Sequence, residues 1–298
     1  MQNKNQLITI ILNCYNGEKY LNEALRSVLS QSYKNWELIF WDNKSTDRSK
    51  KIFKSFKDKR LRYFYSNKHR PLYEAKNLAI KKSKGSYLAF IDADDFWEKN
   101  KLKEQIKLFS DKRVGVVYGN MWIRNEINKR SKLYWKTQLP GGMIYNKIIK
   151  NYCVGIISTM IRKKILNIHK NIFNLKYNHI GDFDLFIKLS RKHKFGVIQS
   201  PVATYRIHGK NLSFINRKNE IYELKDWFNN NKKKLKKDEK VFILKRIEQR
   251  EFLNLKLKGE FLKTFRFLIN KKSLRYKFKN LILLVLPTQL LKTILWYQ

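Results

Sequence analysis

The sequence is poor in cysteine and in long apolar runs. Its 298 residues include two cysteines, Cys14 and Cys153, too few for a disulfide framework and typical of a reducing cytoplasm. The longest uninterrupted aliphatic run, residues 281–286, is far shorter than the ~20 residues that cross a bilayer. The apolar stretch at residues 7–12 is too short and too poorly flanked for a signal peptide. We therefore expect no membrane-spanning helix.

Acidic side chains are also scarce. Lys and Arg number 65 against 24 Asp and Glu, which gives a formal net charge of +41 at pH 7. Such an excess attracts polyanions and anionic membrane surfaces. It is spread along the chain rather than confined to one basic arm, and Lys is accompanied by many Asn, Ile and Tyr residues, as an AT-rich genome would produce. We therefore expect attraction to an anionic membrane surface and no nucleic-acid partner.

Hydrophobic residues make up 43% of the chain, enough for a large core, and they form short runs that alternate with stretches of helical spacing. The predicted strands are residues 7–12, 36–41, 61–65, 86–92 and 114–120, and the predicted helices are 17–32, 47–57, 73–85 and 94–109. This alternation predicts an α/β domain over residues 1–216, with a mostly parallel sheet flanked by helices. Residues 217–298 form a helical, basic extension.

Three carboxylates stand directly behind the strand at 86–92. An Asp-x-Asp sequence such as Asp92-Ala93-Asp94 places two carboxylates on the same side of an extended backbone, where they can bind a hard divalent cation through oxygen. An alternative is that Asp95 caps the helix predicted at 94–109 and that all three carboxylates favour its dipole. The cluster alone does not choose between the two interpretations.

The stretches that follow the other predicted strands point to a family. The segments "NCYNGE", "DNKSTD" and "EAKNLAIKKSKGSYLAFIDADD" resemble, in order and spacing, the opening of glycosyltransferase family 2, the nucleotide-sugar transferases of GT-A fold. The resemblance covers residues 7–97 most closely, extends to about residue 213 and is absent beyond. Three departures are that the usual proline and threonine are missing before Cys14, that Asn43 replaces the second aspartate after Asp42, and that Lys76 replaces an arginine.

The resemblance implies roles for individual residues. It places the donor nucleotide-sugar, most simply a UDP-sugar, on Cys14, Tyr15, Asn16, Glu18, Asp42, Lys76, Asp92, Asp94 and Arg206. Within this set Asp42 reads the base, Arg206 contacts phosphate, and Asp92 serves the ribose or a metal-bound water. The implied cofactor is Mn²⁺ or Mg²⁺, with Asp94 as the principal ligand and His208 completing the metal shell.

The family resemblance also implies an inverting transfer, in which a carboxylate deprotonates the acceptor hydroxyl. The segment "GDFDLFIKL" resembles the family's E-D-x-D-L-W-x-R-L sequence, so Asp182 is the predicted base. Gly181 stands where the family usually has a glutamate. With the register shifted by two residues, Asp184 would be the base and Asp182 a helix cap.

The region from 217 onward alternates Lys and Arg clusters with apolar groups and ends in Trp296 and Tyr297. Basic amphipathic helices of this kind lie in membrane interfaces, so we expect a peripheral protein on the inner face of the cell membrane. The alternative is a helical hairpin packed on the catalytic domain. Membrane contact suits a lipid-linked glycan acceptor, and the resemblance makes bacterial surface-polysaccharide assembly the natural setting. The competing functions are a nucleotidyltransferase and a non-catalytic nucleic-acid or membrane-binding protein on a decayed transferase fold.

Overall fold

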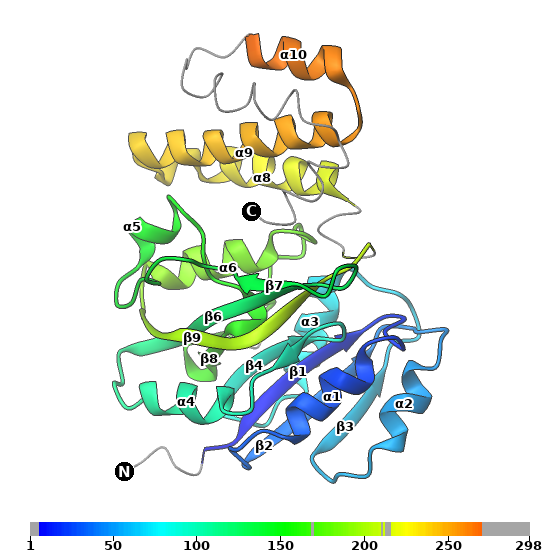
Figure 1. Ribbon diagram of the computed structural model, residues 1–298. Coiled ribbons are helices and arrows are strands. Elements are labelled where there is room, and N and C mark those ends of the chain that lie inside the picture. Colours follow the sequence, from blue (N-terminus) through cyan, green and yellow to red (C-terminus); the bar gives the residue numbers. More distant parts are fainter. Residues whose placement is uncertain (1–5, 168–169, 210, 212–215, 270–298) are drawn as a thin grey trace. The chain divides into compact units, whose positions relative to one another are not determined.

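A computed structural model describes residues 6–167, 170–209, 211 and 216–269. The chain divides into two compact units, with the boundary between Arg206 and Ile207. The first unit is an α/β domain and the described part of the second unit is largely helical, as the sequence predicts (Figure 1). The boundary predicted from composition was after residue 216.

The α/β unit is built on one sheet in which four neighbouring strands run parallel. The strand order is β3-β2-β1-β4-β8-β6-β9-β5, with β7 paired to β6, and β8 runs antiparallel to both β4 and β6. The parallel strands are β3 (Leu61–Tyr65), β2 (Trp36–Asp42), β1 (Ile8–Cys14) and β4 (Tyr87–Asp92). The others are β5 (Phe96–Trp97), β6 (Val114–Asn125), β7 (Ser131–Leu133), β8 (Met160–Arg162) and β9 (Lys194–Ile207).

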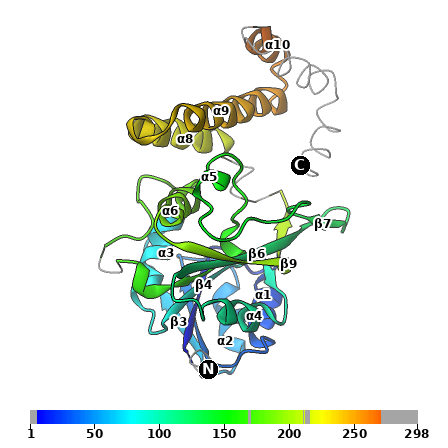
Figure 2. The same cartoon turned by 90° about the vertical axis from the view of Figure 1, so that its left-hand side faces the viewer.

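Helices cover both faces of the parallel strands, which explains why β1 and β2 are apolar along nearly their whole length and buried throughout. In Figure 2, α1, α2 and α4 lie on one side of the sheet and α3 on the other. These helices are α1 (Leu21–Leu29), α2 (Ser49–Ser55), α3 (Leu72–Lys81) and α4 (Lys101–Leu108). The residues of α1 that recur at helical spacing, Leu21, Ala24, Leu25 and Val28, are the ones it buries.

All four predicted helices have different bounds in the structure, and the causes are clear for two of them. The helix predicted to close on Gly85 ends at Lys81, and Gly85 instead lies against β1, where an added Cβ would come within 2.6 Å of the Leu7 carbonyl oxygen. The helix predicted from residue 94 begins only at Lys101, because Phe96 and Trp97 pair with β9 as strand β5. The suggested capping role of Asp95 is therefore wrong.

The remaining elements of this unit are short. They are α5 (Tyr145–Ile148), α6 (Gly181–Ser190) and the 3₁₀ turns η1 (Ile156–Ser158) and η2 (Lys163–Ile165). The predicted turn at Gly141–Gly142 is present, with Gly142 at φ +83° and bridged to Phe195 of β9. That left-handed backbone suits a glycine.

The second unit contains α8 (Arg217–Asn231), η3 (Lys232–Lys234), α9 (Lys237–Leu257) and α10 (Phe261–Ile269). Helices α8 and α9 form a hairpin with an ion pair between Arg250 and Glu220 at 2.7 Å. None of the helices in the described residues is long and apolar enough to cross a membrane. The apolar run at 281–286, Trp296 and Tyr297 lie outside the described residues.

Candidate active site

The carboxyl ends of β1, β2 and β4 meet at one edge of the sheet. Register pairs Cys14 with Asp42 and Asn13 with Asp92, and the arrowheads of β1 and β4 point to the same side in Figure 1. The loop after β1 also approaches the turn after β4, because a Cβ on Gly17 would stand 3.1 Å from that of Ala93. The three stretches singled out in the sequence therefore lie together, as expected for a ligand site in a parallel sheet.

Hydrogen bonds tie the loop after β1 to the loop after β2. The Asn16 side chain accepts from the backbone N–H of Thr46 at 2.8 Å, and the Ser45 hydroxyl accepts from the Asn16 N–H at 3.1 Å. Glu18 accepts from the backbone N–H and the guanidinium of Arg48 at 3.0 and 3.2 Å. The side chains of Asn16 and Glu18 thus connect the two loops, and their donor contacts stay predictions.

Cys14 and Asp42 end their strands with buried side chains. Cys14 is 2% exposed, and burial raises the pKa of its thiol to about 11; its contact with the donor stays a prediction. Asp42 is 1% exposed, and its two oxygens accept from the Ser45 N–H at 2.8 Å and the Tyr63 hydroxyl at 2.6 Å. Burial, with Asp42 alongside, raises the pKa of Tyr63, so this hydroxyl stays protonated. Base recognition by Asp42 stays a prediction.

An exposed aromatic pair stands at the same edge. The Tyr15 ring lies 4.2 Å from that of His69, centroid to centroid, and Asn43 fixes the chain beside them by bonds to the backbone of Arg70 at 2.9 and 3.1 Å. The two rings are tilted by 52° to each other, and exposed aromatic side chains of this kind offer a surface for a nucleotide base. The sequence left His69 unassigned, because no spacing links it to Tyr15.

The acidic cluster is a turn rather than a continuous strand. Asp92 is the last residue of β4, Asp94 lies in the turn, and the Asp95 N–H donates to the Asp92 carbonyl at 3.1 Å. The expectation that Asp92 and Asp94 share one side of an extended backbone is therefore wrong. The side chain of Lys76, 1% exposed, donates to Asp92 at 2.6 Å. Lys76, which the sequence predicts to bind the nucleotide-sugar, is thus ion-paired to Asp92 at the end of β4.

Asp95 is completely buried, and one of its oxygens accepts from the Arg206 backbone N–H at 2.8 Å. Its other oxygen has no hydrogen-bond partner among the described residues. Burial, followed by the charges of Asp94 and Asp92, raises the pKa of Asp95 well above its ordinary value. Burial and these neighbouring charges therefore favour the neutral form of the Asp95 carboxyl.

Arg206 anchors this turn from β9. Its side chain is almost fully buried, and its Nε donates to the Asp94 carbonyl at 2.7 Å. The guanidinium pairs with Glu23 at 2.6 Å and Glu126 at 3.2 Å and lies over the Phe96 ring at 4.7 Å. These contacts give Arg206 a structural role that the sequence did not reveal, and its contact with phosphate stays a prediction.

Asp182 lies in the first turn of α6, one residue inside the helix rather than before it. The buried hydroxyl of Tyr73, on α3, accepts from the Asp182 backbone N–H and donates to its carboxylate. Burial, followed by the charge of Asp182, raises the pKa of Tyr73 well above its ordinary value, so the hydroxyl stays a donor. A Cβ on Gly181 would come within 2.4 Å of the Tyr73 ring, so the glycine makes room for this tyrosine.

Asp184, the other candidate base, faces a different environment. Its side chain is 3% exposed and pairs with Lys188 one turn along α6 at 2.6 Å. Asp182 instead shares Tyr73 with Asp92, whose charge also acts on that hydroxyl. The geometry therefore favours Asp182 as the carboxylate that faces the strand edge.

Among the described residues, no three His, Cys, Asp or Glu side chains form a group able to hold a metal ion unaided. A cation such as Mg²⁺ commonly takes one or two carboxylates and completes its shell with substrate phosphates and water. Asp94, in the turn after β4 with its carbonyl held by Arg206, fits that mode. His208 follows β9, and its backbone N–H donates to Asn211 at 2.6 Å; its role as a ligand stays a prediction.

Comparison with known proteins relates the chain to bacterial glycosyltransferases. Over 221 residues the chain is 29% identical to the UDP-Glc:alpha-D-GlcNAc-diphosphoundecaprenol beta-1,3-glucosyltransferase WfgD of Escherichia coli, covering 74% of this chain and 83% of that protein. The putative teichuronic acid biosynthesis glycosyltransferase TuaG of Bacillus subtilis is 28% identical over 55% of this chain and 65% of its own length.

Solved structures share the fold. S. aureus TarS 1–349 in complex with UDP-GlcNAc superposes with a TM-score of 0.59 at 19% identity, covering 82% of this chain and 72% of that one. The Pyrobaculum calidifontis mannosyltransferase PcManGT, in complex with GDP-Man and Mn²⁺, gives 0.55 at 15% identity over 74% and 64%. Residues 9–171, more than half of the chain, match the model of Glycosyl transferase family 2. The protein therefore belongs to glycosyl transferase family 2 and is a glycosyltransferase of GT-A fold.

Proposed function

We propose that the protein moves a sugar, with inversion, from a UDP-sugar to a hydroxyl of a lipid-linked glycan in bacterial surface-polysaccharide assembly. The observation that supports the proposal is that Asp92 and Asp94 stand at the end of β4 and that Asp92 and Asp182 both act on the Tyr73 hydroxyl. The diphosphoundecaprenol-linked acceptor of WfgD and the UDP-GlcNAc bound to TarS support the lipid-linked acceptor and the uridine donor. The same edge offers the Tyr15–His69 pair to a base.

Asp94 would hold a divalent cation, Mn²⁺ or Mg²⁺, together with the donor's phosphates. When bound, the cation neutralises the charge that develops on the departing nucleoside diphosphate. Arg206 orients Asp94 by donating to its carbonyl, and the buried Asp95 side chain accepts from the Arg206 backbone N–H. Lys76 orients Asp92 through the 2.6 Å ion pair, so that its second oxygen can serve the ribose.

Asp182 acts as the general base that removes the proton from the acceptor hydroxyl. Tyr73 fixes the orientation of this carboxylate and favours its ionised form, because the hydroxyl donates to it. The base therefore sits on a rigid element, at the start of a helix whose position is set by the packing of Gly181 on Tyr73.

Replacing Asp182 with Asn tests the assignment. We expect Asp182→Asn to abolish sugar transfer while the affinity for UDP, measured by calorimetry with Mn²⁺ present, stays that of the wild type. Asp184→Asn serves as the competing variant and Asp111→Asn, at an exposed ion pair, as the remote control. If Asp182→Asn turns over normally and Asp184→Asn does not, the base is Asp184.

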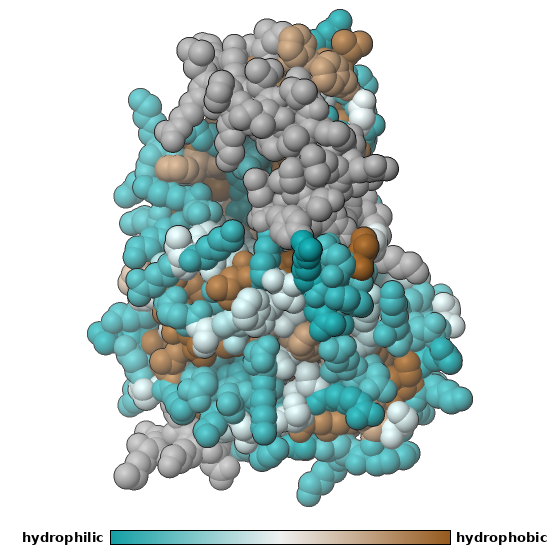
Figure 3. Space-filling model, in the orientation of Figure 1, coloured by the Kyte–Doolittle hydropathy of each residue, from teal (hydrophilic) through white to brown (hydrophobic). Residues whose placement is uncertain are grey.

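We propose further that the second unit docks on an anionic membrane surface through α10. Phe261 and Leu262 of this helix are 53% and 71% exposed beside the basic Lys263 and Arg266, and brown atoms gather over α10 at the top of Figure 3. Apolar side chains rimmed by cations suit the interface of an anionic bilayer. Such docking would bring the enzyme to the inner face of the cell membrane, where its acceptor lies.

Co-sedimentation of the full chain with vesicles tests the docking. We expect Leu262→Glu to weaken pelleting with phosphatidylglycerol vesicles, while Val241→Glu, at an exposed apolar position on α9, leaves it intact. Equal pelleting of both variants with the wild type would rule out α10 as the docking face.

A further inference from the structure

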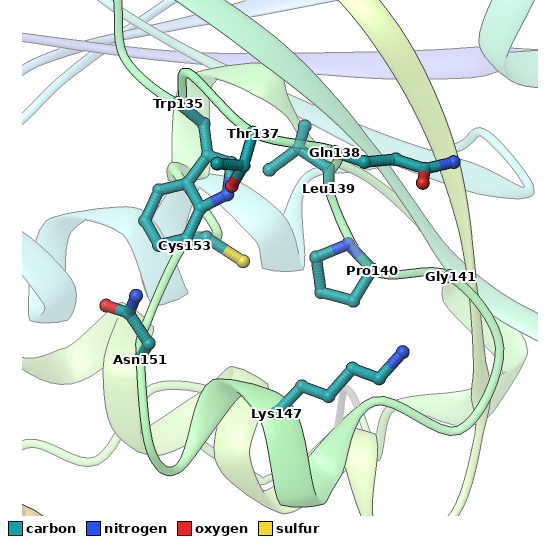
Figure 4. Close-up of a pocket in the computed structure, with 9 residues that line it drawn as sticks. All are labelled: Trp135, Thr137, Gln138, Leu139, Pro140, Gly141, Lys147, Asn151 and Cys153. Carbon is teal, nitrogen blue, oxygen red and sulfur yellow. The ribbon is translucent and has the colours of Figure 1, made fainter.

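A cavity of about 340 Å³ lies outside the residues assigned so far. Its lining comes from the loop after β7, from α5 and from the segment that follows α5; it consists of Trp135, Thr137, Gln138, Leu139, Pro140, Gly141, Lys147, Asn151 and Cys153. In Figure 4, Trp135, Asn151, Lys147 and Pro140 surround one hollow, and the sulfur of Cys153 points into it. The volume falls within the ~300–1,000 Å³ of small-molecule sites.

The loop that carries Trp135 is held by two side-chain amides. Asn120 of β6 accepts from the Trp135 N–H at 3.1 Å and donates to its carbonyl at 2.8 Å. Gln199 of β9 does the same to Leu139, at 2.9 and 3.0 Å. Each side-chain amide makes the pair of hydrogen bonds to the loop backbone that a neighbouring strand would make. The wall of the cavity is therefore fixed before a ligand binds, which lowers the entropic cost of binding.

Further bonds fix the floor of the cavity. The buried Tyr118 hydroxyl donates to the Pro140 carbonyl at 2.6 Å and lies 3.8 Å from the Cys153 sulfur. Burial raises the pKa of the Cys153 thiol, so the floor is neutral. The neighbouring Tyr152 packs edge-on against Phe183 at 5.2 Å between ring centroids, and Phe183 follows Asp182 directly. The cavity is thus connected, through one ring contact, to the helix that carries the base.

The chemistry of the lining selects a class of ligand. An indole face packs against the C–H face of a sugar ring, and the amide of Asn151 and the hydroxyl of Thr137 can bind its polar edge. Lys147 adds a cation at the rim, suited to a phosphate group. A neutral floor, an aromatic wall, amides and one ammonium group together fit a sugar that carries a diphosphate.

We propose that this cavity binds the acceptor, with the first sugar on Trp135 and the diphosphate that links it to the lipid on Lys147. The inference rests on the proposed function and extends it, because it separates the acceptor subsite from the donor subsite at the ends of β1, β2 and β4. The acceptor hydroxyl then approaches the strand edge from the side of α6.

Binding of synthetic acceptors to the full chain tests the inference. The probes are short-chain alkyl diphosphates of N-acetylglucosamine, N-acetylgalactosamine and glucose, and UDP with Mn²⁺ serves as the donor probe in the same titrations. We expect at least one acceptor probe to bind, and Trp135→Ala and Lys147→Ala each to weaken its binding by about tenfold or more, which is ~1.4 kcal/mol. The affinity for UDP should not change.

Two matched variants separate the cavity from general surface effects. Trp122→Ala removes a half-exposed tryptophan from β6, and Lys136→Ala removes an exposed lysine from the same loop; neither side chain lines the cavity. Loss of acceptor binding in these controls as well, unchanged binding in both cavity variants, or no acceptor binding at ~1 mM by a wild type that binds UDP overturns the inference. Failure of the wild type to bind UDP counts instead against the proposed function.

Discussion

The contact between Tyr73 and Asp182 allows the most direct test of the proposed general base. Replacing Tyr73 with Phe removes one hydroxyl and keeps the ring that packs on Gly181. A hydrogen bond to a charged group contributes ~1.5–3 kcal/mol, and one pKa unit corresponds to ~1.4 kcal/mol. Tyr73→Phe should therefore lower kcat/KM by roughly tenfold to a hundredfold.

The pH dependence of the transfer rate is a more specific test of this contact. Because the hydroxyl donates to the carboxylate, its loss raises the pKa of the base, and the acidic limb of the rate profile should move up by about one to two pH units. The burial that holds the pKa of Tyr73 well above its ordinary value keeps the wild-type hydroxyl protonated throughout the assay range. Rates of UDP release between pH 5 and 9 measure the shift.

Tyr33→Phe is the matched control, since its hydroxyl donates to the Gln6 carbonyl at 2.7 Å, away from the strand edge. This variant should keep the wild-type profile. A Tyr73→Phe enzyme with an unshifted acidic limb and kcat/KM within about threefold of the wild type would refute the reasoning.

Three further substitutions probe the same architecture. Gly181→Ala should displace the ring of Tyr73, which stands 2.4 Å from the new Cβ, and lower kcat with little change in UDP affinity; kinetics and calorimetry separate the two. Asp95→Asn should lower the free energy of unfolding only slightly, and the variant should become more stable relative to the wild type as pH rises. The reason is that a carboxyl whose pKa is raised on folding destabilises the wild type as pH rises above the unfolded pKa of 3.8. Urea unfolding of both proteins at pH 5 and pH 8 measures the sign of this change. Arg206→Met should lower the free energy of unfolding by ~1.5–3 kcal/mol, because it removes charge-assisted hydrogen bonds to the Asp94 carbonyl and to Glu126, which keeps its ion pair with Lys129 at 2.6 Å; an unchanged urea midpoint would contradict it.

The parallel half of the fold was predictable because its signals are local. Continuous apolar runs identified β1 and β2, and the helical spacing of Leu21, Ala24, Leu25 and Val28 identified α1. The start of the helix after Asp95 was not predictable, because the two residues of β5 pair with residues of β9 that lie more than 100 positions away. Long-range pairing of this kind leaves no trace in local periodicity.

The motifs marked the acidic residues of the candidate site but not the residues that orient them. The family motif placed Asp92, Asp94 and Asp182, yet the groups that orient them come from positions that no motif marks. One signal was available: Gly181 stands where the family has a glutamate, and glycine in such a place indicates a close approach by another group. The sequence could not name Tyr73 as that group, since the contact spans more than 100 residues.

The paired amides of Asn120 and Gln199 also bear on how this enzyme could diversify. They grip only main-chain atoms of the loop, so the identity of Trp135 or Gln138 matters little to the folding of the strands beneath. With the acceptor in the proposed cavity, natural or laboratory selection could change which glycan is extended by exchanging a few loop side chains that line it. The strands and the residues at their carboxyl ends would stay the same.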